Sequence, residues 1–233
     1  MRRRSFLLGW FPFFHRPKIE LSGIPFRVIY HDRGSHRYLV IHGDEDTARD
    51  VMTKYMSDHK GVAYIVTGKQ REVVIRAVKV DPNRLFSRAG AEFSIRGLNT
   101  DIDVERLIEV LDYLDDERGK LLHHLLPPRD GRLFALHNNR DYSVQDELAA
   151  SNRTSIKQPA LPRNFFLCTD PRDYETLQQS PYNVVLQTDP EPDDGSLSRL
   201  CARRGIRYIN LECAIGEYDA QMERVQWLDQ HLP

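Results

Sequence analysis

The sequence predicts an α/β protein, a three-layer α/β/α sandwich built on a mixed, largely parallel sheet. Short runs of β-branched and aromatic residues alternate with polar segments whose apolar residues recur at helical spacing. The 233 residues, 40% of them hydrophobic, are enough to bury one substantial core. Strands and helices that alternate along one chain typically form a sheet covered by helices. Ligands bind such sheets beyond the carboxyl ends of the strands, so polar residues at those ends are candidates for a functional site.

The apolar runs and the helical periodicities place the elements in order. Strands are expected at 26–30, 38–41, 62–66, 73–78, 132–136, 165–168, 184–186 and 208–211, and helices at 47–55, 100–114, 174–177, 197–203 and 218–232. The most regular helix follows Thr100, its expected cap, because the apolar residues from Val104 to Leu114 keep a 3.6-residue period. Pro82 ends the strand at 73–78, since proline cannot donate to a sheet ladder. The polar stretches 138–162 and 188–196 are expected to be loops.

The composition excludes several classes of protein. Lysine plus arginine (33) nearly balances aspartate plus glutamate (34), so no global field would attract nucleic acid or a membrane surface. Three cysteines without CxxC spacing argue against a disulfide framework and against a thiolate metal site. No stretch approaches the roughly 20 apolar residues of a membrane span. The oligomeric state stays open.

The N-terminus allows two interpretations. Arg3 and Arg4, followed by an apolar run to Phe14, resemble a twin-arginine export signal. The run is short, contains Pro12 and lacks an obvious cleavage site, which favours a basic aromatic arm and retention in the cytoplasm. We therefore divide the chain into an arm or degenerate export signal, 1–22, and a single α/β domain, 23–233.

Three residues at strand ends form a candidate metal site. His42 and Glu45 follow the strand at 38–41, and His137 follows the strand at 132–136. Two histidines and one glutamate are a recurrent ligand set for Zn²⁺ in hydrolases, which leave a fourth position for water. Zinc lowers the pKa of that water toward about 7 and polarises a scissile carbonyl. The alternative for His42 and Glu45 is a strand-end histidine beside an acid that begins a helix, and His137 alone fits a simple turn.

Four further residues complete the expected chemistry. Glu212, after the strand at 208–211, is the candidate general base, although Glu217 and Asp219 lie close by in the sequence. Arg84 with Asn83 suits a substrate carboxylate, because a guanidinium grips both oxygens. Arg76, inside an apolar strand, is the candidate stabiliser of the oxyanion. The alternatives are a solvated loop for Asn83 and Arg84 and a snorkelling edge-strand residue for Arg76.

The motifs, taken together, resemble the zinc carboxypeptidase superfamily, and most closely its succinylglutamate desuccinylase and aspartoacylase branch. That branch carries HGNE, DxNRxF and DLHN motifs in this order, like the segments 42–45, 81–86 and 136–138 here, and an arginine seven residues before the motif asparagine. The resemblance implies a zinc carboxypeptidase-like fold. It also implies the roles given above: His42, Glu45 and His137 as zinc ligands, Asn83 and Arg84 as the carboxylate clamp, Arg76 as the oxyanion stabiliser and Glu212 as the base.

Two functions remain at this point. The expected one is a zinc-dependent hydrolase that cleaves an amide bond beside a free carboxylate, in a small substrate or at a peptide C-terminus. The alternative is a catalytically silent member of the fold that binds zinc or a ligand. Ala135 favours the alternative, because the family commonly has aspartate two residues before the third ligand. Loss of such a supporting carboxylate costs about 10–100-fold in metal affinity or activity.

Overall fold

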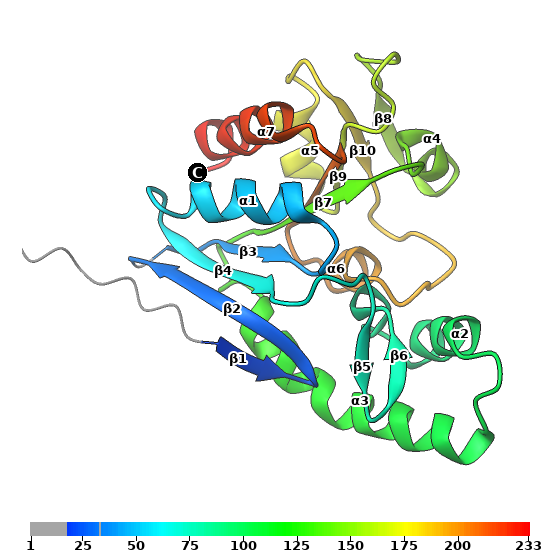
Figure 1. The fold of residues 1–233 in the computed structure, drawn as a ribbon. Helices are drawn as coiled ribbons and strands as arrows, with labels where there is room; N and C mark the ends of the chain where they lie inside the picture. The colour runs from blue at the N-terminus through cyan, green and yellow to red at the C-terminus, as the bar shows by residue number, and fades with distance from the viewer. Residues whose placement is uncertain (1–17, 33) are drawn as a thin grey trace, which may run out of the picture.

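The computed structural model of the chain describes residues 18–32 and 34–233, and its centre is a nine-stranded mixed sheet (Figure 1). Its strands, in chain order, are β1 (Lys18–Leu21), β2 (Ile24–His31), β3 (Arg37–Val40), β4 (Gly61–Val66), β7 (Leu133–Asn139), β8 (Arg153–Ser155), β9 (Phe165–Cys168), β10 (Asn183–Leu186) and β11 (Tyr208–Ala214). Across the sheet they run in the order β1-β2-β4-β3-β7-β11-β9-β10-β8. Of the expected N-terminal arm, residues 1–17 lie outside the described residues, and Lys18–Leu21 form β1.

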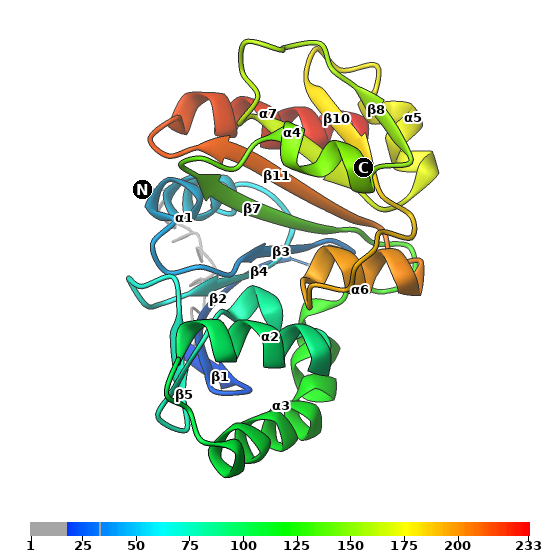
Figure 2. The same cartoon turned by 90° about the vertical axis from the view of Figure 1, so that its right-hand side faces the viewer.

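The middle of the sheet is parallel and positions the site. Strands β4, β3, β7 and β11 are consecutive parallel neighbours, whereas β2 and β9 join them in antiparallel pairs. The carboxyl ends of β3, β7 and β11 therefore meet at one edge (Figure 2). His42 follows β3, and β7 and β11 carry His137 and Glu212. This arrangement brings together three residues that lie far apart in the sequence.

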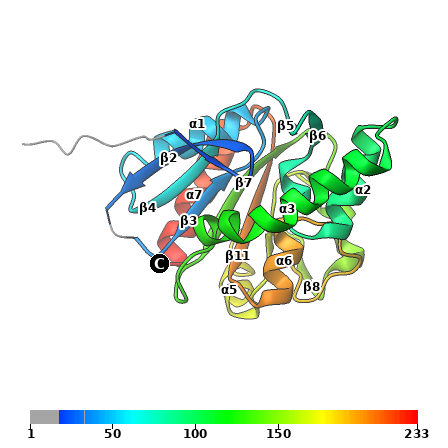
Figure 3. The same ribbon diagram turned by 90° about the horizontal axis from the view of Figure 1, so that it is seen from below.

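Helices cover both faces of the sheet, which confirms the three-layer prediction. The helices are α1 (Asp46–Tyr55), α2 (Arg88–Leu98), α3 (Val104–Leu125), α4 (Val144–Glu147), α5 (Pro171–Leu177), α6 (Leu197–Arg204) and α7 (Tyr218–His231), with short 3₁₀ turns η1 (Pro82–Arg84) and η2 (Leu148–Ala150). One buried cluster joins α2, α3 and α6 to one face of the sheet, and another joins α1, α5 and α7 to the opposite face (Figures 1 and 3).

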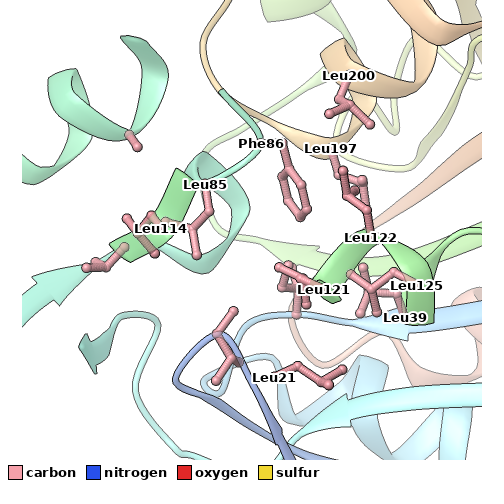
Figure 4. Packing of buried hydrophobic residues seen from close by; sticks show 14 of the residues in the cluster. Leu21, Leu39, Leu85, Phe86, Leu114, Leu121, Leu122, Leu125, Leu197 and Leu200 are labelled. Carbon is pink, nitrogen blue, oxygen red and sulfur yellow. The ribbon is translucent and has the colours of Figure 1, made fainter. Parts of the chain in front are cut away.

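Alternation along β7 shows why both faces are covered. Leu133 and Ala135 belong to the first cluster, whereas Phe134 and Leu136 belong to the second, as expected for a strand buried on both sides. In the first cluster the leucines of α3 pack together with residues of β1, β3 and α6 (Figure 4). The strand that delivers His137 is thus held rigidly between two cores.

The expected helix after Thr100 is present as α3, with a different cap. Asp103, not Thr100, is the N-cap, and its carboxylate accepts a hydrogen bond from the Arg106 N–H at 2.7 Å. An acidic cap is also favourable beside the positive end of the helix dipole. The helix therefore begins three residues later than the sequence pattern predicted.

The prediction of one continuous strand at 73–78 is wrong, because the chain reverses direction within this segment. Val73–Ile75 (β5) and Val78–Val80 (β6) form a separate antiparallel hairpin, and Arg76 and Ala77 are its turn. Both turn residues have left-handed backbone conformations, with φ of 48° and 61°. Two-residue hairpin turns need such angles and usually contain glycine or asparagine. Neither occurs here, so no residue of the turn marks it in the sequence.

The loops also contain elements that the sequence did not reveal. The stretch 138–162 begins with the end of β7 and holds α4, η2 and the edge strand β8, and α2 fills the region before α3. The short helix α4 is defined by a capping box between Ser143 and Asp146. Among the described residues, no helix has the length and apolar character needed to cross a membrane.

Candidate metal site

His42, Glu45 and His137 converge at the carboxyl-end side of β3 and β7, and His137 lies within β7, which continues to Asn139, not beyond the strand end as expected. Glu45 Oε1 lies 2.8 Å from His42 Nδ1 and 3.2 Å from His137 Nδ1. One potential ligand atom from each residue lies within 4.8 Å of the other two, and all three side chains are buried. In the described part of the chain this is the one group of His, Cys, Asp and Glu with such geometry. The predicted ligand set therefore forms a compact cluster.

The residues present fit a zinc ion. Glu45 Oε2 is buried and has no hydrogen-bond partner among the described residues. An unpaired buried carboxylate oxygen is costly, and a cation is one of the few partners that relieve it. Two imidazole nitrogens and a carboxylate match the donor set of catalytic zinc, which keeps one further position open.

Burial and mutual attraction set the charges of the cluster. Burial acts against the charged form of His42, but the Glu45 carboxylate and Asp81 outweigh it and raise the pKa of His42 to about 9. Burial likewise acts against ionised Glu45, yet His137 and His42 lower the pKa of Glu45 to about 2. The carboxylate is therefore ionised at neutral pH, the state that a metal ligand requires.

Gly43 allows the loop 67–72 to pass close to the segment 42–45. Its N–H donates to the Gln70 carbonyl at 3.1 Å, and a Cβ added to Gly43 would lie 2.4 Å from that same oxygen. Arg49 of α1 donates to the Gly43 and Gly68 carbonyls and ties the two segments together. The loop 67–72 between β4 and β5 is thereby held over the ligand cluster.

This crossing loop brings an unexpected arginine to the site. Arg71 NH1 lies 3.8 Å from Glu45 Oε1, and Arg71 NH2 lies 3.6 Å from Asp81 Oδ2. Asp81 itself lies 3.0 Å from His42 Nε2, and that contact together with Arg71 holds the pKa of Asp81 well below its usual range against the effect of burial. The sequence did not predict a role for Arg71, because its loop shows no periodicity and no motif. The contact of Asp81 with His42 was not predicted either, since Asp81 was considered only as part of the segment 81–86.

Arg76 does not join the cluster. It lies at the tip of the β5–β6 hairpin, where its guanidinium pairs with Glu109 of α3 at 2.9 Å and stacks over Tyr113 at 4.5 Å. Its side chain is 46% exposed. The expected position beside the reacting carbonyl depended on a continuous strand through residue 76, and the hairpin turn carries the side chain toward α3 instead.

The turn η1 carries Asn83 and Arg84, which line the same cavity as the predicted ligands. Asp81 caps this turn by accepting from the Asn83 N–H at 2.8 Å. The Asn83 side-chain oxygen accepts from the Leu197 N–H at 3.2 Å, which fixes η1 against the start of α6. The Arg84 guanidinium lies 3.8 Å from Asp194 and is one-third exposed. A cation held in this way is available to a substrate carboxylate.

Glu212 lies within β11, which continues to Ala214, and not beyond the strand end as expected. It pairs in register with His137 on the neighbouring strand and is buried. The amides of Asn139 and Asn210 donate to its two oxygens at 3.0 and 3.1 Å. Burial raises the pKa of Glu212, although His137 and Asn139 act in the opposite direction. Such a carboxyl group is suited to accepting and returning a proton.

One cavity of about 450 Å³ connects these groups. Of the predicted site residues, it is lined by His42, Glu45, Asn83, Arg84, His137 and Glu212. Arg71 also lines it, whereas Arg76 does not. The remaining wall is largely polar and includes Asn139, Tyr142 and Asp194. The cavity can therefore hold a small polar molecule in contact with the ligand cluster, Asn83, Arg84 and Glu212 at once.

Comparison with known proteins gives matches only at the level of structure. No family model and no curated protein matches the chain. A solved structure described as a "putative metallopeptidase" from Shewanella denitrificans OS217 matches with a TM-score of 0.48 and 12% identity, over 94% of this chain and 85% of that chain.

Two other solved structures match over less of their own length. A succinylglutamate desuccinylase/aspartoacylase from Rhodobacter sphaeroides matches with a TM-score of 0.45 and 15% identity, over 93% of this chain and 64% of that chain. A "putative carboxypeptidase" from Burkholderia mallei ATCC 23344 matches with a TM-score of 0.37 and 12% identity, over 85% of this chain and 57% of that chain.

Proposed function

We propose that this protein is a zinc-dependent hydrolase that cleaves an amide bond next to a free carboxylate. The observation that supports it is the single cavity in which a His-Glu-His cluster, a buried glutamate and a carboxylate-binding arginine face one another. His42, Glu45 and His137 would hold the ion. Zinc, when bound, supplies a Lewis acid that polarises the scissile carbonyl and makes water nucleophilic near neutral pH.

Arg84 and Asn83 bind and orient the substrate in this proposal. The guanidinium of Arg84 grips the free carboxylate, and the Asn83 amide nitrogen remains available beside it because the amide oxygen is engaged with Leu197. Asp194, 3.8 Å from the guanidinium, keeps Arg84 directed along the cavity wall. Fixing one end of the substrate places its amide toward the ligand cluster, and such positioning is a large part of catalysis.

Glu212 is the general base. It accepts the proton of the attacking water and returns it to the departing amine, so that both proton transfers use one carboxylate. The donated hydrogen bonds from Asn139 and Asn210 hold its two oxygens in place. Glu212 is buried beside His137 and lines the same cavity as the predicted ligands.

Arg71 takes the role that the sequence pattern assigned to Arg76. It is the cation that lies against Glu45 and Asp81 in the cavity, where negative charge develops on the carbonyl oxygen during attack. A guanidinium placed there stabilises that charge more in the transition state than in the ground state. The loop 67–72, fixed across Gly43, supplies it.

The proposal is tested by metal analysis followed by a substrate panel. The purified protein is expected to bind one zinc ion, and Glu45→Gln, which keeps the size of the side chain, is expected to lose it. Hydrolysis is then measured on N-acyl amino acids and on peptides, each paired with its carboxamide analogue. Turnover of the free acids with loss of turnover for the carboxamides is the expected result. Zinc binding without any turnover would favour the catalytically silent alternative, and absence of zinc binding would overturn the proposal.

A further inference from the structure

Gln221 of α7 lies directly behind the third predicted ligand. It is fully buried, and its side-chain amide contacts two consecutive residues of β7. Its Nε2–H donates to the His137 carbonyl at 3.0 Å, and its Oε1 accepts from Asn138 Nδ2 at 3.1 Å. A glutamine that holds the carbonyl of a ligand residue and the side chain of the next residue restricts how that ligand is presented.

Asn138 extends the contact to α1. Its Oδ1 accepts from the Ala48 N–H at 2.7 Å, in the first turn of the helix. The N-cap of α1 is Glu45, whose own side chain makes no capping hydrogen bond. Asn138 therefore satisfies a helix-start N–H that the cap residue leaves free, because the Glu45 carboxylate is turned toward the histidines.

These contacts form one directed chain. It runs from the Ala48 N–H through the amides of Asn138 and Gln221 to the His137 carbonyl, with each amide accepting at one end and donating at the other. A backbone donor and a backbone acceptor at its two ends fix the orientation of both amides. The chain links the helix that begins at Glu45 to the strand that carries His137, the two segments whose spacing sets the ligand cluster.

The ring of His137 receives little other support. Within residues 18–32 and 34–233, its one hydrogen-bond partner is Glu45, at 3.2 Å. Ala135, two residues earlier, is buried in the apolar cluster under α3 and offers no carboxylate. The direction of the ring therefore depends on the backbone of β7, and Gln221 holds that backbone.

We propose that Gln221 is a positioning residue for the metal site, which acts through Asn138 and the His137 carbonyl and replaces the support that Ala135 does not give. The inference rests on the proposed function, since it requires that the cluster binds zinc. Residues that orient metal ligands typically contribute 10–100-fold to metal affinity. Removing the Gln221 amide is thus expected to weaken zinc binding by that factor and not merely to loosen the fold.

The test compares zinc affinity and zinc-induced stabilisation in Gln221→Met, which keeps the length of the side chain and removes both hydrogen bonds. Affinity is measured by competition with a chromophoric chelator, and the free energy of unfolding is measured with and without zinc. A 10–100-fold loss of affinity corresponds to about 1.4–2.7 kcal/mol less stabilisation by zinc. Asn138→Asp, which keeps an acceptor for Ala48 but cannot donate to Gln221, is expected to lose affinity similarly and serves if the first variant does not fold.

Asn183→Leu is the matched control. Asn183 is also fully buried, and its amide holds the loop 157–164 through backbone groups of Lys157, Gln158, Leu161 and Asn164. This variant is expected to lower the free energy of unfolding while the gain from zinc stays unchanged. If both test variants bind zinc as tightly as the wild type, the positioning role is wrong although the proposed function stands. If the wild type does not bind zinc, the proposed function fails, and the positioning role fails with it.

Discussion

Asp81 Oδ1 lies 3.0 Å from His42 Nε2 and, at 2.8 Å, also accepts from the N–H of Asn83. One carboxylate thus joins a predicted metal ligand to the segment that carries the proposed substrate clamp. With Asp81 holding Nε2, His42 presents Nδ1 toward Glu45, from which it is 2.8 Å away. A carboxylate behind a ligating imidazole fixes its tautomer and raises its basicity.

Asp81→Asn is expected to weaken zinc binding by about 10–100-fold, because a neutral amide supports the imidazole less well than a carboxylate does. The measurement is chelator competition at fixed pH. Asp194→Asn is the control, since Asp194 contacts Arg84 and not the ligands, and it is expected to leave zinc affinity unchanged. Equal affinities in wild type and Asp81→Asn would contradict this role.

Glu212→Gln is expected to lower kcat by about 10²–10⁴-fold, the usual contribution of a general base. Zinc content is expected to remain that of the wild type, because Glu212 is not one of the ligands. Metal analysis and steady-state kinetics on the same preparation separate the two effects. A variant that keeps its kcat would remove Glu212 from the mechanism.

Arg71→Ala and Arg76→Ala form a direct comparison between the arginine at the cluster and the arginine at the hairpin tip. The first is expected to lower kcat by about 10²–10³-fold, as for loss of a group that stabilises developing negative charge. The second removes an exposed ion pair with Glu109 and is expected to leave kcat unchanged. The reverse outcome would restore the role that the motif spacing gave to Arg76.

His36 predicts a dependence of stability on pH away from the cavity. Burial, helped by Arg132, lowers the pKa of His36 from 6.5 to about 4, and its Nδ1 accepts from the Arg132 N–H at 3.2 Å. Between pH 6.5 and 4 the unfolded chain therefore binds more protons at this site, so the free energy of unfolding falls as the pH falls. The contribution is on the order of 1–2 kcal/mol, reduced from the full shift because the ring is partly exposed.

His36→Asn checks this point, because asparagine retains an acceptor for Arg132 but does not titrate. Urea unfolding at pH 7 and pH 4.5 is expected to show a smaller loss of stability in the variant than in the wild type. His123→Asn, at an exposed position near the end of α3, is the control and is expected to lose as much stability as the wild type. An identical loss in His36→Asn and wild type would rule out the effect.

The sequence predicted the elements whose signals are local. The apolar runs that became β3, β4, β7, β9, β10 and β11 stand out because these strands are buried on both faces, and α3 stands out because its buried face repeats every 3.6 residues. His42, Glu45 and His137 were found because they come just after apolar runs of the sequence, although β7 continues past His137 to Asn139. The rule that parallel strands present their carboxyl ends together then predicted the cluster.

The remaining features depend on contacts that no local pattern encodes. Arg71 reaches the site only because its loop is hydrogen-bonded across Gly43, and Gln221 reaches His137 only because α7 packs against α1 and β11. Arg76 was misplaced because the turn at Arg76 and Ala77 contains neither of the residues that usually mark one. Long-range packing decides such positions, and a single sequence does not display it.

The hairpin turn of β5 and β6 also offers a way to make the protein more robust without touching its chemistry. Ala77 holds a left-handed conformation, φ 61°, that costs a non-glycine residue roughly 1–2 kcal/mol. Ala77→Gly removes that strain, and part of the gain is lost to the greater freedom of glycine in the unfolded chain, so we expect about 1 kcal/mol of added stability. Thermal unfolding measures the gain, and unchanged kcat and zinc affinity are expected because the turn does not line the cavity. Tolerance to further mutation around the proposed active site can therefore be increased from a hairpin turn that does not line its cavity.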